Sequence, residues 1–233
     1  RLIENGPMID PDHFLTVRAI KMYADGALGS RGAALLEKYS DYDGKGVFIF
    51  LEEDTKPRLS KALSKGIQIG THAIGDHGNR VVLDWYEETF AQPSHAIGDL
   101  HFAVERLGLD RIDNAYAWRN LIDQGLIIAG GTDAPVEIGD PRIEFYAAVT
   151  RKDVDGYHAD GWNLDQRLTR FEALKMFTIW PAIASFQENV KGTIEVGKLA
   201  DFSIFDQDLM TIPETKILES KNVLTVVGGK VVF

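Results

Sequence analysis

The sequence contains no cysteine among its 233 residues. This absence excludes disulfide bonds, thiolate metal sites and cysteine nucleophiles. Any metal ion must therefore be held by histidine, by carboxylates or by a chemically modified lysine. Histidine is itself scarce, because the chain has only six, so the setting of each one carries information.

Long apolar runs and clusters of positive charge are also missing. No apolar stretch reaches the roughly 20 residues that a membrane helix needs, so we expect no membrane partner. A nucleic-acid surface needs clustered Lys and Arg, whereas the formal net charge here is −10, so we expect no nucleic-acid partner. No signal peptide follows Arg1, which favours a cytoplasmic protein. Because the chain does not begin with Met, a periplasmic or secreted location stays open. A homo-oligomer is also possible.

What is present is an alternation of strands and helices, with apolar residues making up 45% of the chain. Predicted strands cover 14–23, the run "GIQIG" that ends near His72, and the run "LIIAGGTD" that ends in Asp133. Amphipathic spacing predicts helices over 56–66, 77–90, 111–124, 141–150 and 170–179. After residue 190 the pattern changes to short β segments separated by Gly and Asp. We therefore predict an α/β domain over 1–190 and a β portion over 191–233.

Three polar residues each stand at the end of a predicted strand: Lys21, His72 and Asp133. Each has an ordinary explanation, since a strand-end His is often a hydrogen-bonded structural residue and an Asp before Ala-Pro is often a turn or cap. A Lys in a strand can lie on a solvent face. All three at the same end of their strands, however, would converge on one pocket if the strands form a barrel.

These residue types together suit metal-dependent hydrolysis. A neutral imidazole and a carboxylate are ligands for Zn²⁺ or a similar divalent ion. A Lys ammonium has no lone pair, but a Lys that has reacted with carbon dioxide becomes a carbamate that can bridge two metals. A bound metal lowers the pKa of its water to about 7 and so supplies hydroxide, while a nearby carboxylate can carry the proton to a leaving group.

Five longer motifs resemble those of the amidohydrolase superfamily. The branch they resemble is the amidohydrolase-3 type, which includes N-substituted formamide deformylase. The motifs are "IKMYADGALGSRGAAL", "THAIGDHGN", "QPSHAIGD", "AGGTDAPVE" and "GTIEVGKLADFSIFD", and they occur in the order that the family has. The resemblance implies a metal-dependent (β/α)8 TIM-type barrel and a small β-sandwich built from both chain ends. It also implies hydrolysis of an amide-type C–N bond in a small-molecule substrate, with one or two divalent ions, expected to be Zn²⁺.

Site residues follow from the same resemblance. It places Lys21 as the strand-4 lysine, often carbamylated, and His72 as the strand-5 histidine ligand. Asp133 matches the strand-8 aspartate, which binds metal and shuttles protons. His95 falls near the end of strand 7 and Arg31 lies in the loop after strand 4, so both are candidate substrate contacts. A plain loop histidine and a loop-bracing arginine are the alternatives for these two.

Two parts of the family pattern are absent. The chain has no His-x-His pair, which would lie upstream of Arg1 with strands 1 to 3. The histidine that ends strand 6 is also missing, because "EETFA" runs directly into "QPSHA". About one βα unit, on the order of 30 residues, is lost there. We therefore expect an incomplete barrel of about four strands. Either the chain is a fragment, or the sequence joins two segments across a gap between Ala91 and Gln92.

Two alternatives to a metal-dependent hydrolase stay open. Lys21 could form a Schiff base in a barrel lyase, which would leave His72 and Asp133 without a role. A catalytically inactive chain could act as a binding or structural protein, a reading that the absent His-x-His pair favours.

Overall fold

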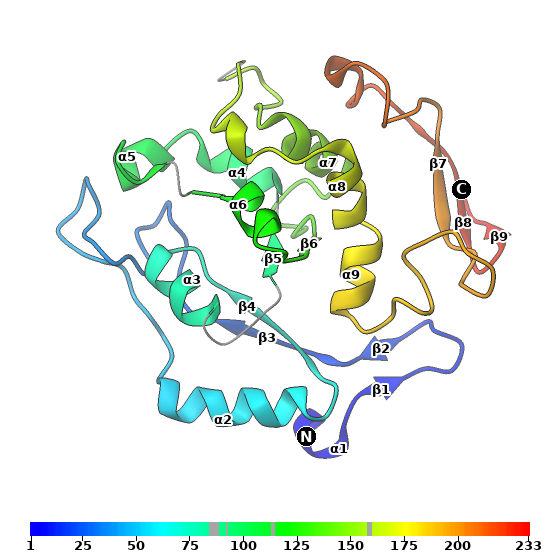
Figure 1. Cartoon of the computed structure of the whole chain (residues 1–233), viewed down its shortest axis with the longest axis horizontal. Helices are drawn as coiled ribbons and strands as arrows, with labels where there is room; N and C mark the ends of the chain where they lie inside the picture. The colour runs from blue at the N-terminus through cyan, green and yellow to red at the C-terminus, as the bar shows by residue number, and fades with distance from the viewer. Residues whose placement is uncertain (84–88, 92, 113–114, 158–159) are drawn as a thin grey trace. The chain divides into compact units, whose positions relative to one another are not determined.

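The computed structural model describes residues 1–83, 89–91, 93–112, 115–157 and 160–233 (Figure 1). The chain divides into two units, each with its own internal contacts. Unit 1 comprises Arg1–Glu87 and Phe102–Ile112, and unit 2 comprises Glu88–His101 and Asp113–Phe233. The two units are described one after the other.

Unit 1 is organised around two parallel strands. β3 (Ala19–Tyr23) pairs with β4 (Gln68–His72), and α2 (Glu52–Leu63) lies between them in the sequence. Parallel neighbours need a crossover of a dozen or more residues, and the segment that contains α2 supplies it. The predicted strand over 14–23 is confirmed in type but is divided in two, because β2 (Thr16–Val17) ends before Arg18 and turns to pair with β1 (Met8–Ile9).

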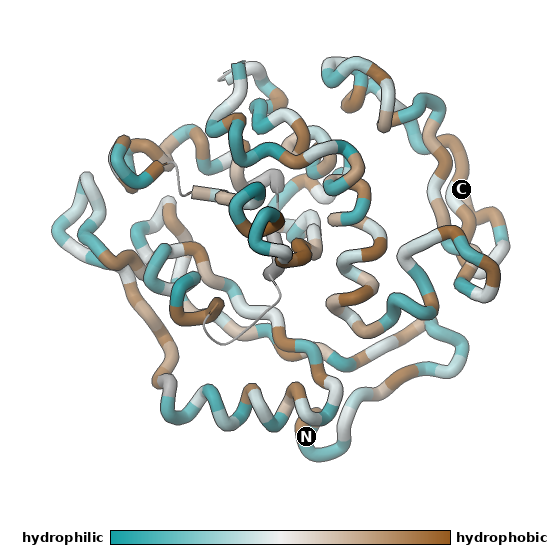
Figure 2. The backbone as a smooth tube through the Cα atoms, viewed as in Figure 1, coloured by the Kyte–Doolittle hydropathy of each residue, from teal (hydrophilic) through white to brown (hydrophobic). Residues whose placement is uncertain are grey.

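One face of the β3–β4 pair packs against α2. Leu59 and Ala62 of the helix form a buried cluster with Ile67 and Ile69, and Ile20 packs against that cluster. Burying each Leu or Ile side chain stabilises the unit by about 1.5–3 kcal/mol. Hydrophobic and hydrophilic residues alternate along α2 in Figure 2, as expected for a helix that covers one side of a sheet. The short α1 (Leu2–Asn5) adds partly buried side chains to the same cluster.

The other elements of unit 1 surround the ends of these strands. α3 (Asp76–Leu83) follows β4 after a short turn, and α5 (Ala103–Leu107) comes from the second segment of the unit. A long connection without helix or strand joins β3 to α2 and buries its own side chains, among them Leu28, Leu35 and Tyr39. Long ordered connections of this kind commonly carry functional residues.

Unit 2 contains a second parallel pair, β5 (Thr89–Ala91) with β6 (Ile128–Gly130). The prediction of one helix over 77–90 is therefore wrong at its end, because residues 89–91 are a strand. Apolar β-prone residues and a neighbouring strand overrode the helical spacing. The predicted helix over 111–124 is shorter than expected, as α6 spans Trp118–Asp123.

Four further helices complete the helical part of this unit: α4 (Pro93–Asp99), α7 (Pro141–Thr150), α8 (Arg170–Met176) and α9 (Ile179–Ala184). Asp140 caps α7 by accepting the backbone N–H of Arg142, and Pro141 occupies the first helical position. Thr169 and Glu172 form a capping box at α8. The buried core of the unit includes Ile128, Phe145, Met176 and Trp180, so strand and helices share one interior.

The residues after 190 form an antiparallel sheet of three strands. β7 (Phe202–Phe205), β8 (Asn222–Val227) and β9 (Lys230–Val231) are hydrogen-bonded in that order, and a register shift occurs at Ile204/Phe205. The predicted change to β structure is thus confirmed. A sandwich needs a second sheet facing this one, so the sandwich itself and the domain division at residue 190 stay predictions.

Within the described ranges the parallel strands form two separate pairs rather than a closed barrel. This agrees with the prediction of an incomplete barrel. The predicted break between Ala91 and Gln92 falls on residue 92, which lies outside the described residues. Among the helices that the structure describes, none combines the length and the apolar character that crossing a membrane requires.

Candidate metal and active-site residues

Lys21 and His72 lie on the same face of the β3–β4 pair. The register places Lys21 beside Gly70 and Tyr23 beside His72. Alternate residues of a strand point to the same face, so these four residues share the face opposite the one packed on α2. Sequence analysis predicted that Lys21 and His72 would come together, and in unit 1 they lie on adjacent strands, both near the carboxyl ends.

Gly70 leaves room between them. A Cβ atom built at this position would meet no atom within 4 Å, so open space lies directly beside Lys21. The Tyr23 ring borders that space, because its centroid is 5.3 Å from Lys21 Nζ and 5.5 Å from the centroid of the His72 ring. Lys21 is exposed, so its amine is accessible to carbon dioxide. Sequence reasoning missed Tyr23, although its spacing of two from Lys21 placed it on this face.

Asp25 is a buried carboxylate that sequence analysis also missed. Its Oδ2 accepts the backbone N–H groups of Ala34 and Gly75, at 2.9 and 2.7 Å, and its Oδ1 accepts that of Ile74 at 2.9 Å. Oδ1 is also 3.9 Å from His72 Nε2, a distance for charge–dipole attraction rather than a hydrogen bond. Asp25 thereby fixes the turn that follows β4, the strand that ends in His72.

The turn after His72 is built for close approach. A Cβ atom at Gly75 would lie 1.8 Å from the carbonyl oxygen of Ala34, so only glycine fits. Asp76 Oδ1 accepts the backbone N–H of Leu36 at 2.8 Å. The two connections that follow β3 and β4 are thus joined by backbone and carboxylate hydrogen bonds, which restricts the backbone that places His72.

Arg31, a predicted substrate contact, is engaged within its own loop. Its Nε and Nη2 atoms donate to the two carboxylate oxygens of Asp41 at 3.1 and 2.8 Å, and Arg106 binds the same carboxylate. The hydrogen bond from Arg31 lowers the pKa of Asp41 and, in turn, raises the pKa of Arg31. The loop-bracing alternative therefore describes the observed contacts, and a substrate role for Arg31 stays a prediction.

Asp133 follows β6 in unit 2. Its backbone has a φ of 49°, in the left-handed region that Asp adopts more readily than most residues. The predicted strand was expected to end in Asp133, but β6 ends three residues earlier, at Gly130. The Asp133 carbonyl accepts the backbone N–H of Val136 at 2.9 Å, so a turn follows Asp133. Asp133 and the Lys21–His72 pair belong to different units, and their meeting at one ion stays a prediction.

His95 lies in α4, just after β5. The alternative of a plain loop histidine is therefore wrong for the backbone, because the chain from Pro93 to Asp99 is helical. A proline in the first position of a helix is favourable, and this signal for helix outweighed the loop composition. The His95 side chain lies outside what the structure describes, so its substrate role stays a prediction.

The donor groups that the structure describes fit a divalent ion only in part. In the described ranges, no group of three or more His, Asp or Glu side chains is placed to hold a metal. His72 supplies one imidazole nitrogen, and the adjacent position is Lys21, which becomes a ligand only as a carbamate. A complete site on this face therefore requires the modified lysine and at least one donor from elsewhere.

Comparison with known proteins identifies relatives of this arrangement. The sequence model of the amidohydrolase family matches residues 3–96 and 89–233. The putative amidohydrolase YtcJ of Bacillus subtilis is 32% identical over 249 residues, covering 92% of this chain and 47% of that protein. The N-substituted formamide deformylase of Arthrobacter pascens is 27% identical over 203 residues, covering 72% of this chain and 37% of that protein.

Solved structures agree with the sequence matches. The crystal structure of an uncharacterized metal-dependent hydrolase from Pyrococcus horikoshii superimposes with a TM-score of 0.76 at 28% identity. It covers 86% of this chain, and the match covers 47% of that protein. This likeness shows that the chain shares the fold of a metal-dependent hydrolase over most of its length, while a closed barrel stays a prediction. The chain spans about half the length, or less, of the relatives it matches.

The predicted loss of one βα unit stays a prediction, although the alignment to YtcJ contains gaps. The match to YtcJ extends over 249 residues, whereas 92% of the 233-residue chain is about 214, so about 35 residues of the relative have no counterpart. The two segments of the family match overlap at residues 89–96, the region where the sequence pattern predicts the missing βα unit. Because the family model matches nearly the whole chain, the chain belongs to the amidohydrolase family.

Proposed function

We propose that this chain forms part of a metal-dependent hydrolase that cleaves an amide-type C–N bond of a small molecule. One observation carries the proposal: Lys21 and His72 share one face at the carboxyl ends of two adjacent parallel strands, with open space at Gly70 between them. Catalytic residues of barrel enzymes gather at this end of the strands. Membership of the amidohydrolase family supports the hydrolytic class.

The ligand set that we propose is His72, carbamylated Lys21 and Asp133. Imidazole nitrogen and carboxylate-like oxygen suit Zn²⁺, although other first-row ions accept the same donors. Carbamylation joins the neutral Lys21 amine to the carbon of carbon dioxide, and the nitrogen loses one proton. When bound, the ion would acidify its water to a pKa of about 7 and polarise the scissile carbonyl.

The protein residues would then orient the substrate and move protons. The hydrogen bonds that Asp25 accepts hold the turn after β4 and so limit the positions open to His72. Asp133 would accept a proton from the nucleophilic water and deliver it to the departing amine nitrogen, which leaves as a neutral amine. Tyr23 borders the same space and offers a phenol group to the substrate.

The substrate class that we propose is an N-substituted amide of formamide size or somewhat larger. The supporting fact is the relation to the N-substituted formamide deformylase of Arthrobacter pascens, a protein of which this chain spans 37%. The barrel loops set specificity and differ most among relatives, so a panel of N-alkyl and N-aryl formamides is the appropriate set of probes.

The test combines metal analysis with a variant. We expect the purified chain, incubated with Zn²⁺ and bicarbonate and then desalted, to retain at least one ion per chain. Asp133→Asn keeps the size but removes the charge, and it should lower turnover of the formamide panel by at least about 100-fold. Undiminished turnover in the variant would remove Asp133 from its proposed role.

A second candidate function is a binding or structural subunit without catalysis. It is favoured by the lack, in the part of the chain that the structure describes, of three His, Asp or Glu side chains around one point. Under this alternative, the desalted chain would hold no stoichiometric metal under any loading condition, and formamide turnover would be absent in both wild type and variant.

A further inference from the structure

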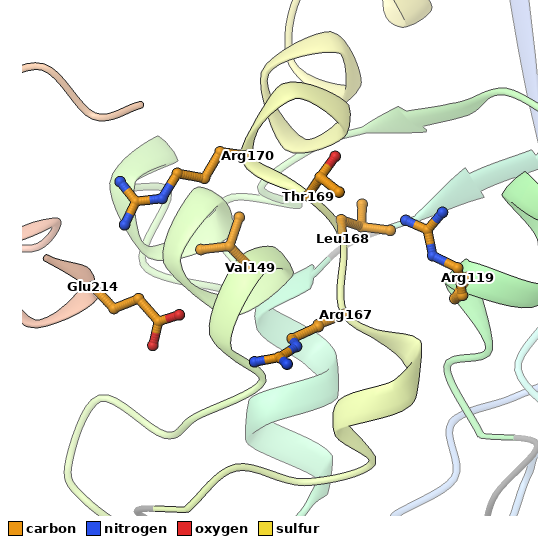
Figure 3. Close-up of a pocket in the computed structure, with 7 residues that line it drawn as sticks. All are labelled: Arg119, Val149, Arg167, Leu168, Thr169, Arg170 and Glu214. Carbon is orange, nitrogen blue, oxygen red and sulfur yellow. The ribbon is translucent and has the colours of Figure 1, made fainter. Parts of the chain in front are cut away.

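We propose that a hollow on unit 2, separate from the strand-end residues, binds a small organic carboxylate through Arg167 and Arg170. The hollow has a volume of about 340 Å³. Its walls include side chains from α6, α7, α8 and the segment before α8, shown as sticks in Figure 3. Those that carry the argument are Arg119, Val149, Arg167, Leu168, Arg170 and Glu214.

The charges around this hollow leave an excess of positive charge. Arg119 is neutralised because Glu172 accepts two hydrogen bonds from its guanidinium. Glu214 is already paired with Lys152, at 3.6 Å. Arg167 and Arg170 remain as positive charges without a carboxylate hydrogen-bonded to them in the described ranges. A local excess of this kind is unexpected on a chain whose formal net charge is −10.

Arg170 is held in place by carbonyl groups. Its Nη1 atom donates to the carbonyl of Leu209 and its Nη2 atom to the carbonyl of Ile212. The charge of Arg170 contributes to the lowered pKa of Asp208, but no hydrogen bond to that carboxylate is among those of the described residues. A cation that is ordered before binding loses little conformational entropy when an anion arrives.

Arg167 has a fixed backbone and a free side chain. Its backbone N–H donates to Leu164, and the next residue, Leu168, donates to Ala148 at 2.9 Å. The guanidinium has no hydrogen bond or ion pair with any residue in the ranges that the structure describes. In Figure 3 it points toward the same space as the carboxylate of Glu214, yet no ion pair joins these two described residues.

The shape and polarity of the hollow select the class of ligand. The planar guanidinium presents parallel N–H groups that match the two oxygens of a carboxylate. Val149 and Leu168 are buried apolar residues that offer a surface for a short hydrocarbon part. Glu214 faces the same space and repels anions, most strongly those with more than one negative charge. The volume lies near the lower end of ligand sites, about 300–1,000 Å³, and accommodates a ligand of roughly the size of benzoate.

The test is a titration of the whole chain with sodium benzoate, followed by NMR of the arginine Nε–H groups at constant ionic strength. We expect saturable shifts of Arg167 and Arg170. Arg167→Gln should weaken benzoate binding about tenfold, since one charge-assisted bidentate contact is lost. Arg167 is exposed and makes no side-chain contact with the described residues, so this variant should fold as the wild type does, which far-UV circular dichroism checks.

Matched controls separate a site from general charge attraction. Arg80→Gln removes an exposed arginine of α3 in unit 1 and should leave benzoate affinity unchanged. Glu214→Gln removes the opposing carboxylate and should strengthen binding. Equal weakening by Arg80→Gln, weaker binding by Glu214→Gln, identical shifts with sodium chloride, or no saturation would each overturn the proposal. Tighter binding of inorganic phosphate than of benzoate would overturn the assignment of a monocarboxylate.

Discussion

Oδ1 of Asp25 lies 3.9 Å from Nε2 of His72. Asp25 follows β3 and His72 ends β4, so the two residues are far apart in the sequence. The Asp25 side chain is fully buried, and its carboxylate accepts three backbone N–H groups. A buried carboxylate is costly unless its lone pairs are satisfied, and here the backbone satisfies them. The candidate metal ligand His72 therefore ends β4 just before a turn that a single carboxylate holds together.

Replacing Asp25 should destabilise unit 1 strongly. Asp25→Ala leaves three backbone N–H groups without their acceptor, and a cost of about 1–3 kcal/mol for each gives a loss of several kcal/mol. Urea denaturation monitored by circular dichroism measures it. Asp43→Ala, which removes an exposed partner of Lys38, is the control and should cost less than about 1 kcal/mol. Similar losses for the two variants would contradict the role given to Asp25.

Two glycines near the site should differ in how much stability is lost when each is replaced by alanine. Gly75→Ala would bring a Cβ atom to 1.8 Å from the carbonyl oxygen of Ala34, so we expect a loss of at least about 2 kcal/mol. Gly70→Ala meets no atom within 4 Å and should leave stability within about 0.5 kcal/mol of wild type. Thermal melts of both variants decide the matter, and a stable Gly75→Ala protein would show that the turn is looser than described.

Metal uptake should depend on carbon dioxide through Lys21. Wild-type chain loaded with Zn²⁺ in the presence of bicarbonate should retain more metal than chain loaded under degassed conditions, because only the carbamate is a ligand. Lys21→Met should show no bicarbonate dependence, and metal analysis by mass spectrometry provides the readout. Covalent trapping of a carbonyl compound on Lys21 by borohydride, with no metal retained, would favour the Schiff-base lyase instead.

The Arg119–Glu172 pair predicts a loss of stability in acid. Burial favours a higher pKa for Glu172, but hydrogen bonds from Arg119 and Thr169 outweigh it and lower the pKa to about 2. A carboxylate whose pKa is lower in the folded chain stabilises above the unfolded value and loses that contribution as pH falls to about 2. The pair is partly exposed, so we expect about 1 kcal/mol. The stability difference between wild type and Glu172→Gln should shrink from pH 7 to pH 2.5.

Arg151 should be essential to the stability of unit 2. Its guanidinium is buried and lies 4.6 Å from the Trp118 ring and 4.9 Å from the Trp162 ring, while Nη1 donates to the carbonyl of Tyr116 at 3.0 Å. Burial lowers the pKa of Arg151 to about 10, which leaves it charged at neutral pH. Arg151→Lys keeps the charge but loses the planar stacking and the fork of donors, so we expect a loss of about 2 kcal/mol or more. Urea denaturation measures it, with the exposed Arg80→Lys as the control.

The sequence by itself determined the alternation of strands and helices before residue 190, the placement of Lys21, His72 and Asp133 in or just after predicted strands, and the family. These features depend on local periodicity, on turn residues and on motifs a few residues long, all of which can be read along the chain. The shift to β structure after residue 190 was likewise visible in composition. The strand at Thr89–Ala91 was missed because these residues continue the apolar spacing of a helix. They form a strand because they pair with β6.

Tertiary structure alone decided which polar groups meet. Asp25 accepts N–H groups from Ile74 and Gly75, 49 and 50 residues away, and nothing in the short motif "ADG" encodes those partners. The sequence did not show that Arg31 binds Asp41, and the hollow at Arg167 exists only where three helices adjoin. Hydrogen bonds and charges act over a few ångströms, so their partners are fixed by the path of the folded chain rather than by spacing in the sequence.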